Sequence, residues 1–102
     1  MEYLFTYGTL QDPQVQEYIF GRFLKGMPDA LLGFKKMENA VYGRYPLVLQ
    51  TNNQQDKVQG QVYEVSENDL KKADIYETSA YKRKKFPLES GGTAWVYIEN
   101  SK

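Results

Sequence analysis

The stretch Tyr3-Leu4-Phe5-Thr6-Tyr7-Gly8-Thr9-Leu10 decides the fold near the start of the sequence. Its first five residues alternate between two faces and predict a strand over 3–7. Gly8 then turns the chain, and Asp12-Pro13 is typical of a helix start, with an N-cap residue followed by proline. Backbone N–H groups at such a strand–turn–helix junction can bind a carboxylate or another anion. A lone glycine often serves only as a turn residue, so a site here depends on a second feature elsewhere in the chain.

The rest of the sequence alternates short strand patterns with a second helix. The helix after Asp12 is expected to end near Gly21, and strands are predicted over 30–37, 45–49, 58–65, 81–88 and 93–99, with a capping box at 66–69 opening the second helix. Polar residues 52–56 and 89–92 are interpreted as two hairpin loops. Gly60, in the middle of a strand, indicates a bulge or another backbone passing close by. The order β-α-β-β-β-α-β-β predicts one α+β domain, residues 1–102, around a curved or closed sheet.

Composition excludes several classes of chemistry. The 102 residues include no cysteine and no histidine. Disulfide scaffolds, thiol nucleophiles, Ser-His-Asp triads and the commonest zinc sites are therefore excluded. Acid–base chemistry would have to use carboxylates, lysines or tyrosines, and nine tyrosines and five phenylalanines predict a core or a pocket rich in rings.

Charge and hydropathy give no sign of a nucleic-acid or membrane partner. Thirteen basic residues balance thirteen acidic ones, so no net field attracts a polyanion. No apolar run approaches the ~20 residues that span a bilayer, and no signal-peptide pattern is visible. We expect a soluble cytoplasmic protein.

Glu77 is the second feature. Leu70, Ala73, Asp74 and Glu77 form one stripe of the predicted second helix, and an inward stripe would carry Glu77 toward the core at the helix C-terminus. Burial and the negative end of the helix dipole would both raise the pKa of its carboxyl group, toward the range useful in acid–base catalysis. Spacing alone leaves the other orientation open, in which Ile75 and Tyr76 face inward and Glu77 is solvated. Asp74 is expected to be a structural partner for a tyrosine hydroxyl or a backbone N–H.

The run Tyr81-Lys82-Arg83-Lys84-Lys85-Phe86 is basic and flanked by aromatic residues, which is compatible with nucleic-acid binding. Strand alternation divides its charges between two faces, however, and rows of lysine commonly protect exposed strand edges. We therefore expect no nucleic-acid partner.

Four motifs occur in one order and resemble a known family. They are Tyr7-Gly8-Thr9-Leu10, Tyr45-Pro46-Leu47-Val48, Val58-Gln59-Gly60-Gln61-Val62-Tyr63, and Asp74-Ile75-Tyr76-Glu77 followed by Tyr81 and Arg83. Together they resemble the gamma-glutamyl cyclotransferase-like superfamily, and the first two are most similar to its gamma-glutamylamine cyclotransferase branch. The resemblance runs from Tyr3 to about Ile98. One departure is Thr78, which stands where many members have glycine, so the helix is expected to end differently.

The resemblance implies a small mixed β-barrel with flanking helices and a cavity at one mouth. It implies that Tyr7, Gly8, Thr9 and Leu10 hold a glutamyl group, that Glu77 is the catalytic acid–base, and that Tyr45 and Tyr81 line the pocket. The implied reaction converts a gamma-glutamyl amine or amide to 5-oxoproline and a free amine, and it needs no metal and no cofactor.

Two other functions remain open on the sequence. One is a non-catalytic module that binds a small gamma-glutamyl or carboxylate ligand, for which an exposed Glu77 paired with Arg83 or a lysine would be typical. The other is a protein-interaction domain, which predicts an exposed apolar patch instead of a polar cavity.

Overall fold

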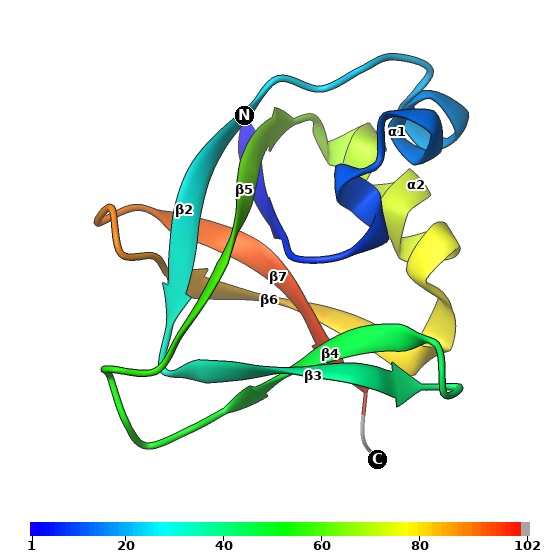
Figure 1. Ribbon diagram of the computed structural model, residues 1–102. Coiled ribbons are helices and arrows are strands. Elements are labelled where there is room, and N and C mark those ends of the chain that lie inside the picture. The colour runs from blue at the N-terminus through cyan, green and yellow to red at the C-terminus, as the bar shows by residue number, and fades with distance from the viewer. Residues whose placement is uncertain (101–102) are drawn as a thin grey trace.

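The computed structural model describes residues 1–100 and consists of two sheets with two α-helices packed at one side (Figure 1). The elements in chain order are β1 (Glu2–Thr6), η1 (Thr9–Gln11), α1 (Pro13–Phe20), β2 (Gly26–Leu32), β3 (Phe34–Val41), β4 (Tyr45–Gln50), β5 (Lys57–Val65), α2 (Glu67–Glu77), η2 (Thr78–Ala80), β6 (Tyr81–Pro87) and β7 (Thr93–Glu99). The α+β class predicted from the sequence is therefore confirmed.

The larger sheet is mixed and has the strand order β2-β5-β1-β7-β6. β1 runs parallel to β7, and the other neighbours are antiparallel. β3 and β4 form a separate two-stranded sheet. The expected barrel is wrong in one respect, because the sheets do not close. The edge strands β2 and β6 approach each other near a single bridge, from Leu31 to Leu88, without forming a ladder within the described chain.

Two details of the predicted strand arrangement are also wrong. The strand expected over 30–37 is in fact the end of β2 and the start of β3, separated by a turn at Gly33 with φ 78°. The loop at 52–56 does not close a hairpin, because β4 pairs with β3 whereas β5 pairs with both β1 and β2. The 81–88 and 93–99 hairpin is confirmed as β6 and β7, and the lysine run lies on β6 at the sheet edge.

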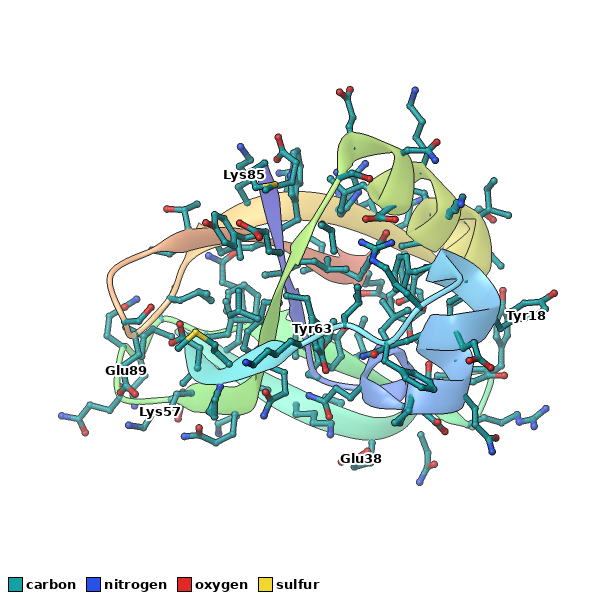
Figure 2. The ribbon with its side chains drawn as sticks, turned by 90° about the horizontal axis from the view of Figure 1, so that it is seen from above. Tyr18, Glu38, Lys57, Tyr63, Lys85 and Glu89 are labelled. Atoms are coloured by element: carbon teal, nitrogen blue, oxygen red, sulfur yellow. The ribbon has the colours of Figure 1, made fainter. Side chains whose placement is uncertain are left out.

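The larger sheet is covered on both faces. Side chains on one face, including Leu4, Tyr63 and Val65, pack with α1 and α2, and Tyr63 lies in the interior in Figure 2. Phe5 and Val96 face the opposite way and pack against β3 and β4 through Phe34 and Val48. The strand alternation predicted for 3–7 is thus confirmed, and it places the end of β1 between two cores.

Gly60 and the sheet ends complete the scaffold. A Cβ atom on Gly60 would overlap the carbonyl oxygen of Thr6 on β1, so the predicted close approach of another backbone is confirmed.

At the sheet end away from the helices, Lys57 and Glu89 form an ion pair of 2.8 Å, and Figure 2 labels both residues. Over residues 1–100, no helix has both the length and the apolar character needed to cross a membrane.

Candidate active site

A cavity of about 370 Å³ lies where the end of β1, the tip of the β3–β4 hairpin and the C-terminal end of α2 meet. All seven residues singled out from the sequence line it. The lining residues are Phe5, Thr6, Tyr7, Gly8, Thr9, Leu10, Val41, Tyr42, Arg44, Tyr45, Pro46, Tyr76, Glu77, Thr78, Tyr81 and Tyr97. The first loop and Glu77, almost seventy residues apart in the chain, therefore face one space.

The loop from Tyr7 to Leu10 leads from β1 into the short turn η1. The first N–H to donate within this turn belongs to Gln11, which donates to the Gly8 carbonyl oxygen at 3.0 Å. The preceding N–H groups stand at the start of a helical turn, where donors have no partner inside the turn. Asp12 caps α1 as predicted, its carboxylate accepting from the Gln14 N–H at 2.9 Å.

Gly8 is required by space and not by its φ angle. Its φ is −144°, outside the left-handed region. A Cβ atom there would lie 3.0 Å from Cγ of Pro46, at the start of β4. The glycine thus lets the loop pack directly against the hairpin that forms another wall of the cavity.

Helix α2 turns Glu77 toward the cavity. Its capping box forms as predicted, with Ser66 and Asp69 each accepting from the other's N–H, at 3.0 and 2.8 Å. Leu70 and Ala73 are buried, whereas Ile75 is 78% exposed. The inward stripe predicted from the sequence is therefore confirmed, and the alternative with Ile75 inside is wrong.

The carboxyl group of Glu77 lies in a poorly solvated place. No ion pair is recorded for it among residues 1–100. Burial raises its pKa from the usual 4.5 to about 7. Near neutral pH the group is present in both protonation states, which suits a residue that first accepts and later donates a proton.

Thr78 ends the helix in an unusual conformation. Its φ is 65° and its ψ is −173°, a region that glycine normally occupies, and its N–H donates to the Asp74 carbonyl oxygen. The helix thus ends directly after Glu77. The family's glycine is absent here, but the backbone keeps a glycine-like shape.

Asp74, one turn before Glu77, belongs to a different network. It accepts hydrogen bonds from the Arg83 guanidinium at 2.7 and 2.8 Å and from the Tyr97 hydroxyl at 2.7 Å. The predicted structural role of Asp74 as the partner of a tyrosine hydroxyl is thus confirmed. Arg83, which the binding-module alternative would pair with Glu77, is paired with Asp74.

Two tyrosines of the cavity, Tyr7 and Tyr81, are held by backbone acceptors. The Tyr7 hydroxyl donates to the Tyr97 carbonyl oxygen at 2.6 Å, and the Tyr81 hydroxyl donates to that of Pro46 at 2.7 Å. Burial, with the nearby Glu77 charge among the lesser causes, raises the pKa of Tyr81 to about 12 and that of Tyr7 further still. Both rings therefore stay neutral and shape the wall around Glu77.

Sequence reasoning missed Arg44, Tyr42 and Tyr76 as cavity residues. Tyr76 shares a hydrogen bond of 3.0 Å with Thr9, which links the loop to α2. Arg44 and Tyr42 sit in the turn between β3 and β4, and the prediction lacked this hairpin. Gly33 and Gly43 were the available signal in the sequence, because glycine commonly marks a turn, and in the structure both have positive φ on either side of β3.

The site as a whole is a cavity in a small mixed α+β fold, with the single carboxyl group of Glu77 and the Tyr7–Leu10 loop in its lining. The family profile described as "Gamma-glutamyl cyclotransferase, AIG2-like" matches residues 4–102. The chain belongs to this family, as its motifs predicted. No curated protein sequence matches it.

Solved structures share the fold at low sequence identity. Two solution structures of Arabidopsis thaliana proteins superpose with TM-scores of 0.81 and 0.82 at 23% and 22% identity, covering 97% and 99% of this chain and 62% and 71% of theirs. A protein named gamma-glutamyl cyclotransferase superposes with a TM-score of 0.72 at 17% identity, over 96% of this chain and 66% of its own. The chain thus spans less than two thirds of the first Arabidopsis protein, and at these identities the likeness concerns the fold.

Proposed function

We propose that the protein is a cyclotransferase that converts a gamma-glutamyl amine or amide to 5-oxoproline and a free amine by intramolecular aminolysis. Glu77 is the general acid–base, and the Tyr7–Leu10 loop holds the glutamyl group. Tyr45 and Tyr81, which line the same cavity, bind the substrate. The proposal is supported above all by one observation: a carboxyl group with a pKa of about 7 lies in the cavity that the loop lines.

The chemistry requires one group that moves protons from the attacking nitrogen to the leaving nitrogen. Ionised Glu77 removes a proton from the substrate α-ammonium, and the freed amine attacks the γ-carbonyl carbon. A C–N bond forms and the carbonyl oxygen takes up negative charge. When the carbonyl re-forms, the original amide C–N bond breaks, and protonated Glu77 gives its proton to the leaving nitrogen. Glu77, ionised again, then takes the second proton from the ring nitrogen and passes it to the freed amine, which leaves as an ammonium ion. Two protons leave the attacking nitrogen and both reach the leaving amine, so atoms and charge balance without a co-reactant, and one carboxyl group with a raised pKa serves each transfer.

Positioning supplies much of the remaining rate. The attack closes a five-membered ring within one molecule, and well-oriented intramolecular reactions gain up to ~7–11 kcal/mol. The N–H groups of the loop can hold the substrate carboxylate or stabilise the developing oxyanion. Rigid walls help in the same way, because Tyr7 and Tyr81 are fixed by their hydrogen bonds.

The cavity and the partner of Arg83 also bear on the other two functions. A binding module was expected to show an exposed Glu77 paired with a cation, but Arg83 is occupied by Asp74. An interaction domain was expected to present an apolar patch instead of a polar cavity, whereas the cavity contains a carboxyl group, hydroxyl groups and a guanidinium group. Both observations favour the enzyme.

The test is 5-oxoproline release from a panel of gamma-glutamyl amines and dipeptides. Glu77→Gln should keep the fold and ligand affinity but lose turnover by ~10²-fold or more, because the proton carrier is gone. Glu64→Gln is the matched control, since this exposed glutamate lies outside the cavity and its substitution should not change turnover. Equal rates for Glu77→Gln and wild type would remove Glu77 from the mechanism. Binding without turnover across the panel would instead support the binding module.

A further inference from the structure

Arg44 is the cationic residue of the cavity. The sixteen lining residues, all within the described chain, include two that carry formal charge, Glu77 and Arg44. Glu77 lies in the less solvated part, as its raised pKa indicates, whereas Arg44 is exposed at the rim. A ligand that reaches from Glu77 to the rim therefore ends next to a guanidinium group.

The three arginines of the chain differ in what they bind. Arg22 donates two hydrogen bonds to the Asp69 carboxylate, at 3.1 and 2.7 Å, and Arg83 does the same to Asp74. Arg44 has no carboxylate within ion-pair distance among residues 1–100. A guanidinium group matches a carboxylate in geometry as well as in charge, because it can donate two parallel hydrogen bonds. In Arg44 these donors are available to a ligand.

The hairpin tip holds Arg44 in place. The chain turns through Tyr42 and Gly43, both at positive φ, and the Arg44 N–H closes the turn by donating to the Val41 carbonyl oxygen at 3.0 Å. The guanidinium carbon of Arg44 lies 5.7 Å from the ring centre of Tyr45, within the range of cation–π attraction. A side chain restrained in this way loses less freedom on binding an anion than a free surface arginine does.

We infer that Arg44 is a specificity residue that selects gamma-glutamyl substrates whose leaving amine carries a carboxylate, such as an amino acid or a peptide. The inference rests on the proposed function, because it takes the glutamyl group to be held by the Tyr7–Leu10 loop. It further takes the leaving amine, beyond the scissile amide at Glu77, to extend toward the hairpin tip, whose Tyr42 and Arg44 line the same cavity. The carboxylate of the leaving amine then pairs with Arg44, in the way that Asp69 and Asp74 pair with the other two arginines.

The test compares two substrates that differ in this one group, gamma-glutamylglycine and gamma-glutamylglycinamide. For the wild type, kcat/KM should favour the glycine substrate by about fivefold, the size typical of a partly exposed charge pair, and the preference should shrink in high salt. Arg44→Gln should remove the preference by lowering kcat/KM for the carboxylate substrate alone. Arg44→Glu should reverse it. Lys35→Gln, an equal charge change on β3 outside the cavity, should leave the preference unchanged.

Calorimetric binding of the same two compounds separates this inference from the proposed function. If no compound of the panel, these two included, is turned over but Arg44→Gln weakens binding of the carboxylate compound alone, the cyclotransferase fails and the role of Arg44 in binding stands. If Arg44→Gln weakens both compounds equally, Arg44 contacts the shared glutamyl part and the inference is wrong. An unchanged preference in Arg44→Gln, or no binding of either compound to the wild type, also overturns it.

Discussion

Arg83 forms its ion pair with Asp74, and Glu77 lies one helical turn beyond that pair, with no cationic side chain of residues 1–100 at ion-pair distance. The Arg83 hydrogen bonds are the main cause that lowers the pKa of Asp74, and the Tyr97 hydroxyl adds to it. Burial raises the pKa of Glu77 on the same helix. The pKa values of two carboxyl groups on one helix are thereby shifted in opposite directions, a pattern typical of acid–base sites.

The first prediction concerns this separation. Asp74→Asn removes the charge that neutralises Arg83, so the pKa of Glu77 should fall below about 7. Arg83→Gln leaves the Asp74 charge uncompensated, so the pKa of Glu77 should rise. The double variant should return it toward the wild-type value. NMR titration of the Glu77 side-chain carboxyl carbon measures this without relying on activity, and shifts in the same direction for both single variants would contradict the prediction.

The second prediction concerns stability. Folded Glu77 holds its proton up to about pH 7, whereas the unfolded chain releases it near 4.5. The folded state therefore binds more protons in this window, and the free energy of unfolding should fall as the pH rises through it. The difference between the two pKa values corresponds to roughly 3 kcal/mol.

The Glu77→Gln variant lacks the titrating carboxyl group, so its free energy of unfolding cannot show this fall. Between about pH 4 and about pH 8 its stability relative to the wild type should therefore increase by roughly 3 kcal/mol, as measured by urea unfolding. The exposed control Glu64→Gln should keep a constant difference from the wild type. A constant difference for Glu77→Gln as well would mean that the carboxyl group is well solvated.

Local signals in the sequence predicted where α2 begins and which residues of its first turns are buried, but not which side chain at its end faces inward. The capping box fixes where α2 begins, and Leu70 and Ala73 fix which of its faces is buried. Spacing could not choose between Glu77 and Ile75 as the inward residue, because that depends on what packs at the helix end. The orientation of the helix end is fixed by β6 and β7, because Arg83 and Tyr97 on these strands bind Asp74.

The missing information was long-range. The β3–β4 hairpin was overlooked because most of β3 is exposed and its sequence does not alternate between apolar and polar residues. Its pairing with β4 places Arg44 at the cavity, and no local pattern around Arg44 indicates this. The incomplete closure of the sheet is likewise a matter of where β2 and β6 end. Motif order located the site, but tertiary pairing determined one of its walls.

The third prediction concerns the loop. Gly8→Val places methyl groups against Pro46, whose Cγ already lies 3.0 Å from a Cβ at this position, so the loop must move away from the hairpin. Affinity for a gamma-glutamyl ligand should fall by tenfold or more, about 1.4 kcal/mol, while the circular dichroism spectrum stays native. Gly92→Val is the matched control, because its Cβ would meet only Ser90 Oγ, at 3.9 Å. Unchanged affinity in a folded Gly8→Val protein would place the ligand elsewhere.

The fourth prediction concerns Thr78. Its φ of 65° and ψ of −173° carry a cost on the order of 1–3 kcal/mol for a residue with a side chain, and glycine removes that cost. Because glycine also makes the unfolded chain more flexible, by about 0.5–1 kcal/mol, the net gain from Thr78→Gly should be about 1 kcal/mol. Ser79→Gly is the control, since residue 79 has no positive φ and the change should be neutral or destabilising. If urea unfolding shows the two variants equally destabilised, Thr78 is not strained, and the end of the helix at Glu77 must be fixed by side-chain packing.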